Sequence, residues 1–197
     1  NNFIMKKIFT MVVLALTTLT MSAQDDSKFT IKAGAGLSTL VGSDVNNVES
    51  VFSYKVGLSY DWNITEKFLI TPGIEFATKG FKVDGIVGDI SMSYLQLPIL
   101  AAYKFNITDN IKLAVKAGPY LSYGIFGSDI EWYGGGETNV FDSDGGYNRF
   151  DAGAIAGVSV EFSQYMVGVE YSRGLTKLDS DYKQYNQAFG VVFGYKF

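Results

Sequence analysis

Eight segments of this chain alternate large apolar side chains with small or polar ones, and this pattern constrains the fold more than any other feature. The clearest segment is residues 188–197, where bulky side chains stand at Phe189, Val191, Phe193 and Tyr195 and small or polar residues separate them. Because successive side chains of a β-strand point to opposite faces, a period of two predicts a strand with one apolar face. The same pattern recurs near residues 29–37, 51–62, 67–81, 91–105, 111–126, 149–162 and 165–173.

The connections between these segments are alternately short and long. Tight turns are expected at 63–66, 106–109 and 163–164, and long, polar, Gly-rich loops at about 39–50, 82–90, 127–148 and 174–186. Short turns on one rim and long loops on the other are typical of outer-membrane β-barrels, with the turns in the periplasm and the loops outside. The sequence therefore predicts an all-β fold, an eight-stranded antiparallel up-and-down transmembrane β-barrel.

A soluble barrel of the lipocalin type also has alternating strands, but its apolar face points inward around a ligand. The placement of the aromatic residues favours the membrane barrel, because they gather at strand ends, as in Tyr60 with Trp62 and Tyr103 with Phe105. Such ends match the aromatic girdles at the two membrane interfaces. The opposite face mixes Gly and Ala with charges of both signs, as a crowded polar interior would.

The N-terminus has the features of a secretory signal peptide. Lys6 and Lys7 form a basic start, residues 8–21 form a short apolar core, and cleavage is expected between Ala23 and Gln24. We therefore divide the chain into an N-terminal extension with a cleaved signal peptide (1–23) and a barrel domain (24–197). The predicted location is the cell outer membrane.

Composition excludes several functional classes. The chain has no Cys and no His, so it lacks thiolate chemistry and the commonest general base and metal ligand. Removal of the signal leaves 14 basic against 20 acidic residues, which disfavours nucleic-acid binding. We predict no enzymatic activity and name no catalytic residue, cofactor or metal ligand.

Charged residues on the less apolar face are the candidates for a functional interior. An eight-stranded barrel has a lumen that side chains can fill, so buried charges must pair. We expect a structural salt-bridge core, with a narrow ion or solute path as the alternative. The predicted inward charges are Lys32, Lys55, Lys79, Lys104, Lys112, Lys116, Arg149 and Lys196, with Asp61, Glu75, Asp151, Glu161 and Glu170.

The third long connection is the candidate partner-contact loop. It contains Trp132, Tyr133, Phe141 and Tyr147 around three consecutive glycines. Aromatic side chains on an acidic loop suit contact with an envelope protein or a glycan. They equally suit docking on the lipopolysaccharide surface or folding back over the mouth of the barrel.

Residues 94–100 (YLQLPIL) and 103–105 (YKF) resemble the central strand signature of the PorT-type outer-membrane β-barrel family of Bacteroidota. Residues 149–153 (RFDAG) and 171–175 (YSRGL) agree with this resemblance, which extends to small barrels of the OmpX/OmpA kind. It implies contact with the outer-membrane assembly machinery, for which the terminal Phe197 would be the recognition signal. Its named PorT branch implies a part in protein secretion.

The function that we predict is a structural or interaction role. The barrel would anchor in outer-membrane lipid and lipopolysaccharide and display four extracellular loops. Two alternatives stay open at this point: a PorT-like accessory of a protein secretion apparatus, and a narrow carrier of small apolar solutes.

Overall fold

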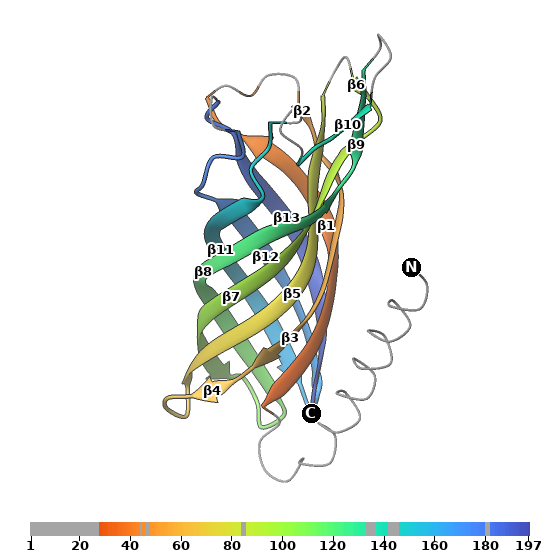
Figure 1. The fold of residues 1–197 in the computed structure, drawn as a ribbon. Coiled ribbons are helices and arrows are strands. Elements are labelled where there is room, and N and C mark those ends of the chain that lie inside the picture. Colours follow the sequence, from red (N-terminus) through yellow and green to blue (C-terminus); the bar gives the residue numbers. More distant parts are fainter. Residues whose placement is uncertain are drawn as a thin grey trace, which may run out of the picture.

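The computed structural model describes residues 28–43, 45, 48–83, 86–132, 137–141, 146–179 and 182–197, with only the backbone at 86–87, 129–132 and 137–138. The predicted signal peptide lies outside the described residues. Eight long antiparallel strands, which run obliquely to the barrel axis, form a closed barrel (Figure 1). They are β1 (Phe29–Val41), β3 (Val51–Tyr60), β5 (Phe68–Val83), β7 (Ile90–Asn106), β8 (Ile111–Gly127), β11 (Phe150–Phe162), β12 (Tyr165–Gly174) and β13 (Tyr185–Lys196).

Each long strand pairs with its neighbours in the chain, and the first pairs with the last. The β1–β13 ladder closes the barrel and runs from Thr30↔Lys196 to Val41↔Tyr185. The predicted all-β, eight-stranded antiparallel fold is therefore confirmed. Among the described residues, no helix is long and apolar enough to span a membrane.

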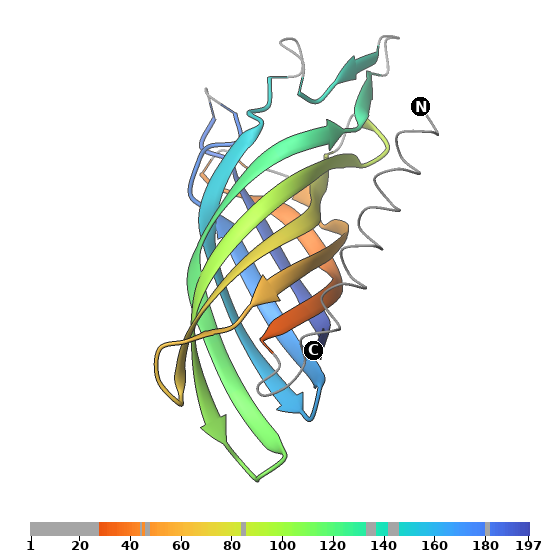
Figure 2. The same ribbon diagram turned by 60° about the horizontal axis from the view of Figure 1, so that its bottom comes forward.

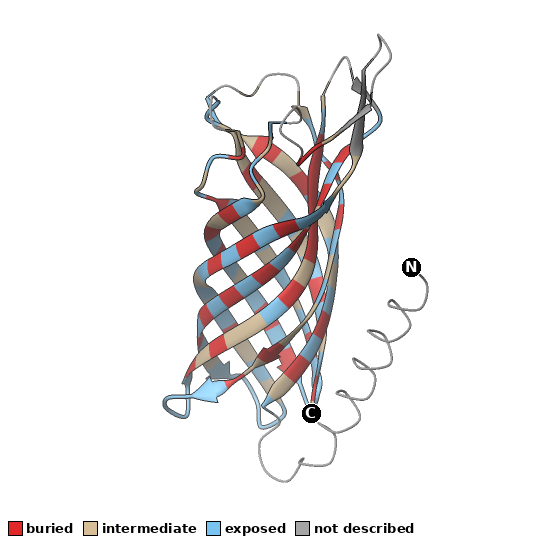
Figure 3. Cartoon of the chain, viewed as in Figure 1, coloured by how far each residue is buried: buried red, intermediate tan, exposed pale blue. Residues whose placement is uncertain are grey.

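Burial alternates along the strands as the period of two requires. In β13 the side chains of Phe189, Val191, Phe193 and Tyr195 are exposed, while Val192 between them is buried. The alternating exposed and buried positions of Figure 3 recur on β7, β8 and β11. The outer surface is thus apolar and the inner surface carries the polar residues, which is the reverse of a soluble ligand-binding barrel.

The connections divide the molecule into a turn end and a loop end. Hairpin turns join β7 to β8 and β11 to β12 at the turn end (Figure 2). In the first turn Ile107 N–H donates to Ile111 O, and in the second Ser163 adopts a φ of 50°. The longer connections lie at the opposite end. Five short strands also occur: β4 (Trp62–Asn63) is the separate end of the strand predicted at 51–62, and four were not expected from the sequence, namely β2 (Val48–Glu49), β6 (Ile86–Val87), β9 (Asp129–Trp132) and β10 (Glu137–Asn139). Of these, β10, β9 and β6 form a separate three-stranded sheet at the loop end.

Two side-chain hydroxyl groups form hydrogen bonds with backbone groups of β3 and β5 where the pairing of these strands ends. Their ladder ends at Lys55↔Ala77. Beyond it, Tyr54 N–H donates to Thr78 Oγ1 at 2.8 Å, and the hydroxyl donates back to Tyr54 O at 3.2 Å. Ser38 Oγ similarly accepts from Gly80 N–H (2.7 Å) and donates to Gly80 O (2.9 Å). These two hydroxyls satisfy backbone groups that would otherwise lack partners in the wall.

Candidate functional site

The barrel interior at the turn end contains a ring of four charges. Lys104 Nζ lies 2.9 Å from Asp61 Oδ2 and 3.2 Å from Glu161 Oε2, and Lys196 Nζ lies 3.2 Å and 2.6 Å from the same two oxygens. Thr71 Oγ1 donates to the other Asp61 oxygen at 3.1 Å. Each cation therefore bridges both carboxylates. We call these four charged residues the turn-end layer.

The turn-end layer borders a polar chamber of about 600 Å³, whose other lining residues include Lys28, Lys112 and Ser163. Lys112 faces the chamber and is exposed, so it is an inward residue at the rim rather than a buried one.

A second group of charges fills the middle of the barrel. Lys32 Nζ lies 2.5 Å from Glu75 Oε1 and 3.8 Å from Glu170 Oε1, while Lys55 Nζ contacts Glu170 and lies 3.9 Å from Glu75 Oε2. Gln96 Nε2 donates to Glu75 Oε2 at 3.1 Å. The two lysines and two glutamates, here called the middle layer, again share every charge between two partners. The nearby Lys116 instead places its ammonium 3.2 Å from the sulfur of Met166.

The third layer, towards the loop end, is centred on Asp151. Its Oδ2 accepts from Lys79 Nζ at 2.8 Å, from Tyr120 Oη at 3.0 Å and from Asn186 Nδ2 at 3.2 Å. Its Oδ1 accepts from Thr176 Oγ1 at 3.0 Å. Asp151 is 2% exposed and Lys79 is 4% exposed. We call these five residues the Asp151 layer.

Above the Asp151 layer, apolar side chains close the loop end. This mouth cluster is built from strands and from the third and fourth loops, and it consists of Leu40, Phe81, Ile90, Met92, Tyr94, Val140, Phe141 and Leu178. The ring of Tyr94 meets that of Phe141 edge-on, with centroids 6.0 Å apart and an interplanar angle of 86°.

Two glycines of β8 make room for the third loop to enter the mouth. A Cβ on Gly124 would lie 2.3 Å from Phe141 Cζ, and one on Gly127 would lie 2.1 Å from Val140 Cγ1. Any side chain there would displace the loop. The guanidinium of Arg149 lies 4.9 Å from the centre of the Phe141 ring and donates to Gly124 O at 3.2 Å, so it contacts both the ring and the strand that makes room for it.

The residues of the predicted partner-contact loop do not share one environment. Phe141 is buried in the mouth cluster, and half-buried Tyr147 packs edge-on against Phe81 with centroids 5.9 Å apart. Burial, together with the nearby Asp179 carboxylate, raises the pKa of Tyr147. Both side chains adopt the folded-back arrangement, the alternative that the sequence left open. Trp132 belongs to β9 with only its backbone described, and Tyr133 lies outside the described residues.

Phe197 lies where the barrel closes. Its N–H donates to Phe29 O at 2.9 Å, and Phe29 N–H donates back to Phe197 O at 3.2 Å. Its ring stacks on Phe29 and Tyr195 with centroids 6.3 Å and 6.4 Å away. The terminal residue therefore extends the closing ladder. Its role in recognition by the assembly machinery stays a prediction.

Sequence reasoning identified the charges of all three layers but missed their neutral partners. Tyr120, Asn186 and Thr176 complete the Asp151 layer, and Gln96 and Thr71 complete the other two. Tyr120 has the inward parity of Lys112 and Lys116, and Asn186 has that of Lys196. The same period of two could have found both.

Chemically, the charges of the three layers neutralise one another inside the barrel. In the three layers, the carboxylates of Asp61, Glu75, Asp151, Glu161 and Glu170 all accept from lysine. No group of three or more His, Cys, Asp or Glu that could hold a metal occurs in the part of the chain that the structure describes.

Comparison with known proteins agrees with this architecture. The crystal structure of the outer membrane enzyme PagL is 16% identical and has a TM-score of 0.55, with 85% of this chain and 99% of that chain covered. The crystal structure of Neisserial surface protein A (NspA) is 14% identical with a TM-score of 0.52, covering 86% of this chain and 97% of that one. At these identities the likeness concerns the fold. No curated protein matches the chain. The family model described as outer membrane protein beta-barrel domain matches residues 22–180, and the chain therefore belongs to this family of outer-membrane β-barrels.

Proposed function

We propose that this protein is a closed outer-membrane barrel with a structural or interaction role, which anchors in lipid and presents its long loops at the cell surface. The observation that carries the proposal is the filled interior: three ion-paired layers follow one another along the barrel, and the mouth cluster covers the last of them.

The energetics of the layers support a closed lumen. A wide, water-filled channel solvates its lining charges, so they need no partners. Here Lys32, Glu75, Lys79 and Asp151 are each at most 6% exposed. Unpaired charges at such positions would cost several kcal/mol each. These charged side chains can therefore occupy the lumen because they pair across it. The same contacts block the passage of ions and solutes.

The apolar mouth cluster adds a second barrier. Water and ions have no polar partners among Leu40, Phe81, Ile90 and Leu178, so the cluster excludes them. The remaining space near the middle layer is a cavity of about 50 Å³, next to Gly34, Gly190 and Lys55. It suits a few water molecules rather than a solute.

Presentation of the loops follows from the unequal ends of the barrel. We place the turn end in the periplasm and the loop end outside, as in other barrels of this class. The β10-β9-β6 sheet would then project from the cell surface. Trp132, whose backbone belongs to this sheet, and Tyr133, the next residue in the sequence, are the loop aromatics that we propose for contact with an envelope protein or a glycan.

Fractionation and surface proteolysis test this proposal. The full-length protein should be recovered with the outer membrane and migrate differently in detergent gels before and after heating. Protease added to intact cells should cleave within 133–145 and leave the turn at 106–109 uncut until the envelope is permeabilised. Recovery from the soluble periplasm, or cleavage at the turn before permeabilisation, would overturn the proposal.

A deletion strain separates the proposed role from the alternatives. Sensitivity to detergents with normal secretion and uptake is the result expected for an envelope protein. Failed export of secreted substrates would instead assign the PorT-like accessory role, which rests on the resemblance at residues 94–100 and 171–175. Loss of uptake of small apolar molecules would assign the carrier role.

A further inference from the structure

Arg173 is an exception on the outer surface of the barrel. Of the exposed side chains on the eight long strands that face away from the lumen, two are charged, Lys82 near the end of β5 and Arg173 near the end of β12. Lys82 is paired, with its Nζ 3.4 Å from Glu49 Oε2. The side chain of Arg173 makes no hydrogen bond or ion pair with the described part of the chain, so its guanidinium is available to a ligand.

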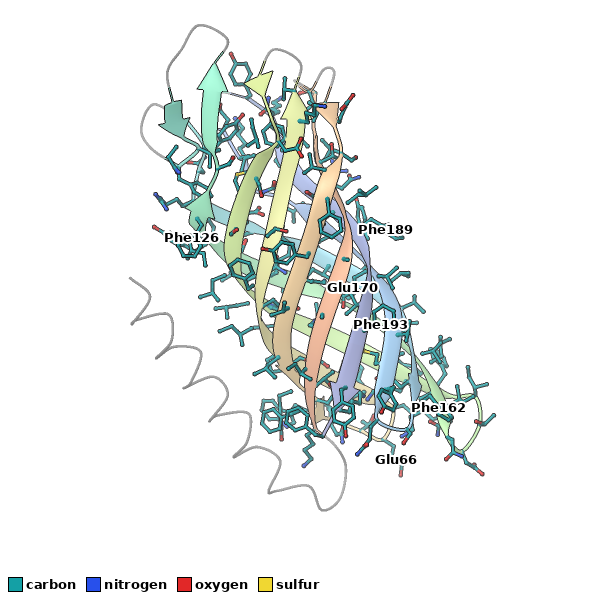
Figure 4. All side chains as sticks on the ribbon, turned by 90° about the vertical axis from the view of Figure 1, so that its right-hand side faces the viewer. Glu66, Phe126, Phe162, Glu170, Phe189 and Phe193 are labelled. Carbon is teal, nitrogen blue, oxygen red and sulfur yellow. The ribbon has the colours of Figure 1, made fainter. Side chains whose placement is uncertain are left out.

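The surroundings of Arg173 are apolar on the side that faces the middle of the barrel. Its register partners are Ala154 on β11 and Gln187 on β13. The next outward pair on β12 and β13 is Tyr171 with Phe189. Figure 4 shows Phe189 projecting outward from the wall, closer to the loop end than Phe193. The amide oxygen of Gln187 already accepts from Tyr171 Oη at 3.1 Å, which leaves the guanidinium beside it without an acceptor.

The height of Arg173 places it at the boundary of the apolar band. Tyr165, at the turn end of the same strand, is exposed and its ring contacts that of Tyr195, so we take this end as the aromatic girdle of the turn-end interface. Eight strand positions at about 3.3 Å each, tilted by about 40°, raise Arg173 by about 20 Å above Tyr165. Because the apolar band of such barrels is about 25 Å tall, Arg173 lies just within its far edge. A cation at this depth is costly unless it reaches an anion at the interface.

The geometry points to a phosphate as that anion. A guanidinium presents a planar fork of donors that matches two phosphate oxygens, and its charge makes such hydrogen bonds strong. Ala154, the register partner of Arg173, and Ala156, the register partner of Tyr171, are exposed and have small side chains, so an acyl chain can lie along the wall there. A phosphate attached to an acylated lipid satisfies both features together.

We propose that Arg173 binds the phosphate of an outer-leaflet lipid of the lipid A class, with an acyl chain of the same lipid packed over Ala154 and Ala156. The inference rests on the outer-membrane anchoring and orientation proposed above. It adds a specific headgroup contact to what would otherwise be a general preference for lipid.

Vesicles of defined composition test this site. Wild-type protein, Arg173→Gln, Arg173→Lys and the control Lys67→Gln, which removes an exposed cation at the turn end, are folded into phosphatidylcholine alone or mixed with bisphosphorylated lipid A. The temperature at which folded-state gel mobility is lost should rise with lipid A for the wild type and Lys67→Gln. Arg173→Gln should lose most of this rise. Arg173→Lys should keep part of it, because the lysine ammonium retains the positive charge but lacks the planar pair of donors of the guanidinium.

Lipid A that co-purifies from the vesicles gives a second readout, and Arg173→Gln should retain about tenfold less of it. An unchanged rise and unchanged retention in Arg173→Gln would overturn the site, as would equal losses in Lys67→Gln. Lipid A is present in both leaflets of the vesicles, so this result does not depend on orientation. If protease does not cleave the loops on intact cells, but Arg173→Gln still loses the stabilisation by lipid A, only the proposed orientation is overturned and the site stands.

Discussion

Breaking the Lys79–Asp151 pair should produce one of the largest losses of stability that a single substitution can cause in this barrel. Asp151→Leu removes the acceptor of four hydrogen bonds and leaves the ammonium of Lys79, which is 4% exposed, without a carboxylate. Removing one partner of a buried ion pair costs about 3–5 kcal/mol of unfolding free energy.

Removing the other partner, in Lys79→Met, should lower the unfolding free energy by less than Asp151→Leu does. Lys79→Met leaves Asp151 with donors from Tyr120, Asn186 and Thr176, which still solvate its charge. Its expected cost is therefore lower, about 1–3 kcal/mol. In Asp151→Leu, by contrast, the Lys79 ammonium keeps the Tyr120 hydroxyl at 3.2 Å and the ring faces of Tyr120 and Tyr94, whose centres lie 4.2 Å and 5.1 Å away. These contacts solvate its charge less well than a carboxylate does.

The double variant Lys79→Met/Asp151→Leu removes both charges and puts apolar atoms in their place. It should be more stable than the sum of the single losses implies, with a coupling energy of about 2 kcal/mol. Urea unfolding in lipid vesicles, followed by gel mobility, measures all four proteins. Glu66→Leu, an exposed turn residue labelled in Figure 4, is the matched control and should change the unfolding free energy by less than about 0.5 kcal/mol. Additive single losses, or an Asp151→Leu protein as stable as Glu66→Leu, would refute the claim that this pair is buried and mutually dependent.

Three further predictions concern the mouth, the closing strand and the turn-end layer. Phe141→Ala should cost about 3 kcal/mol of stability and expose the mouth cluster to a hydrophobic dye, whereas the exposed loop residue Leu175→Ala should do neither. Deletion of Phe197 should lower the amount of protein assembled in the outer membrane more than it lowers folding in detergent; equal membrane levels would argue against an assembly signal. Lys196→Met, which breaks contacts of 2.6 Å and 3.2 Å, should lower the urea midpoint clearly, while Lys112→Met at the exposed rim should leave it unchanged.

The barrel could be predicted from sequence because alternate residues of each strand face the outer surface and the lumen, and the two faces need different side chains. Strand β13 shows this directly, since Phe193 faces out and Val192 faces in. The same local rule identified Lys79 and Asp151 as inward residues without any knowledge of their partners. It also placed the turns at 106–109 and 163–164, where polar residues interrupt the alternation.

The mouth cluster could not be predicted in this way. Phe141 enters the barrel because Gly124, which lies on β8 and is separated from Phe141 in sequence but next to its ring in space, lacks a side chain there. A loop aromatic carries no periodic signal that tells whether it faces solvent or packs inward. The β8 ladder is also irregular near Ser93 and Tyr94, where a register shift lets Ile125 and Phe126 both lie exposed. Such register shifts depend on the partner strand, so the alternation along a single strand cannot predict them.

Conductance of the purified protein in a planar lipid bilayer tests the closed lumen most directly. With the three charge layers and the mouth cluster in place, the wild-type barrel should insert without discrete current steps at any applied voltage that the bilayer tolerates. Reproducible open steps of uniform size from the wild-type protein would contradict the filled interior and, with it, the proposal that this barrel acts as an anchor rather than a pore.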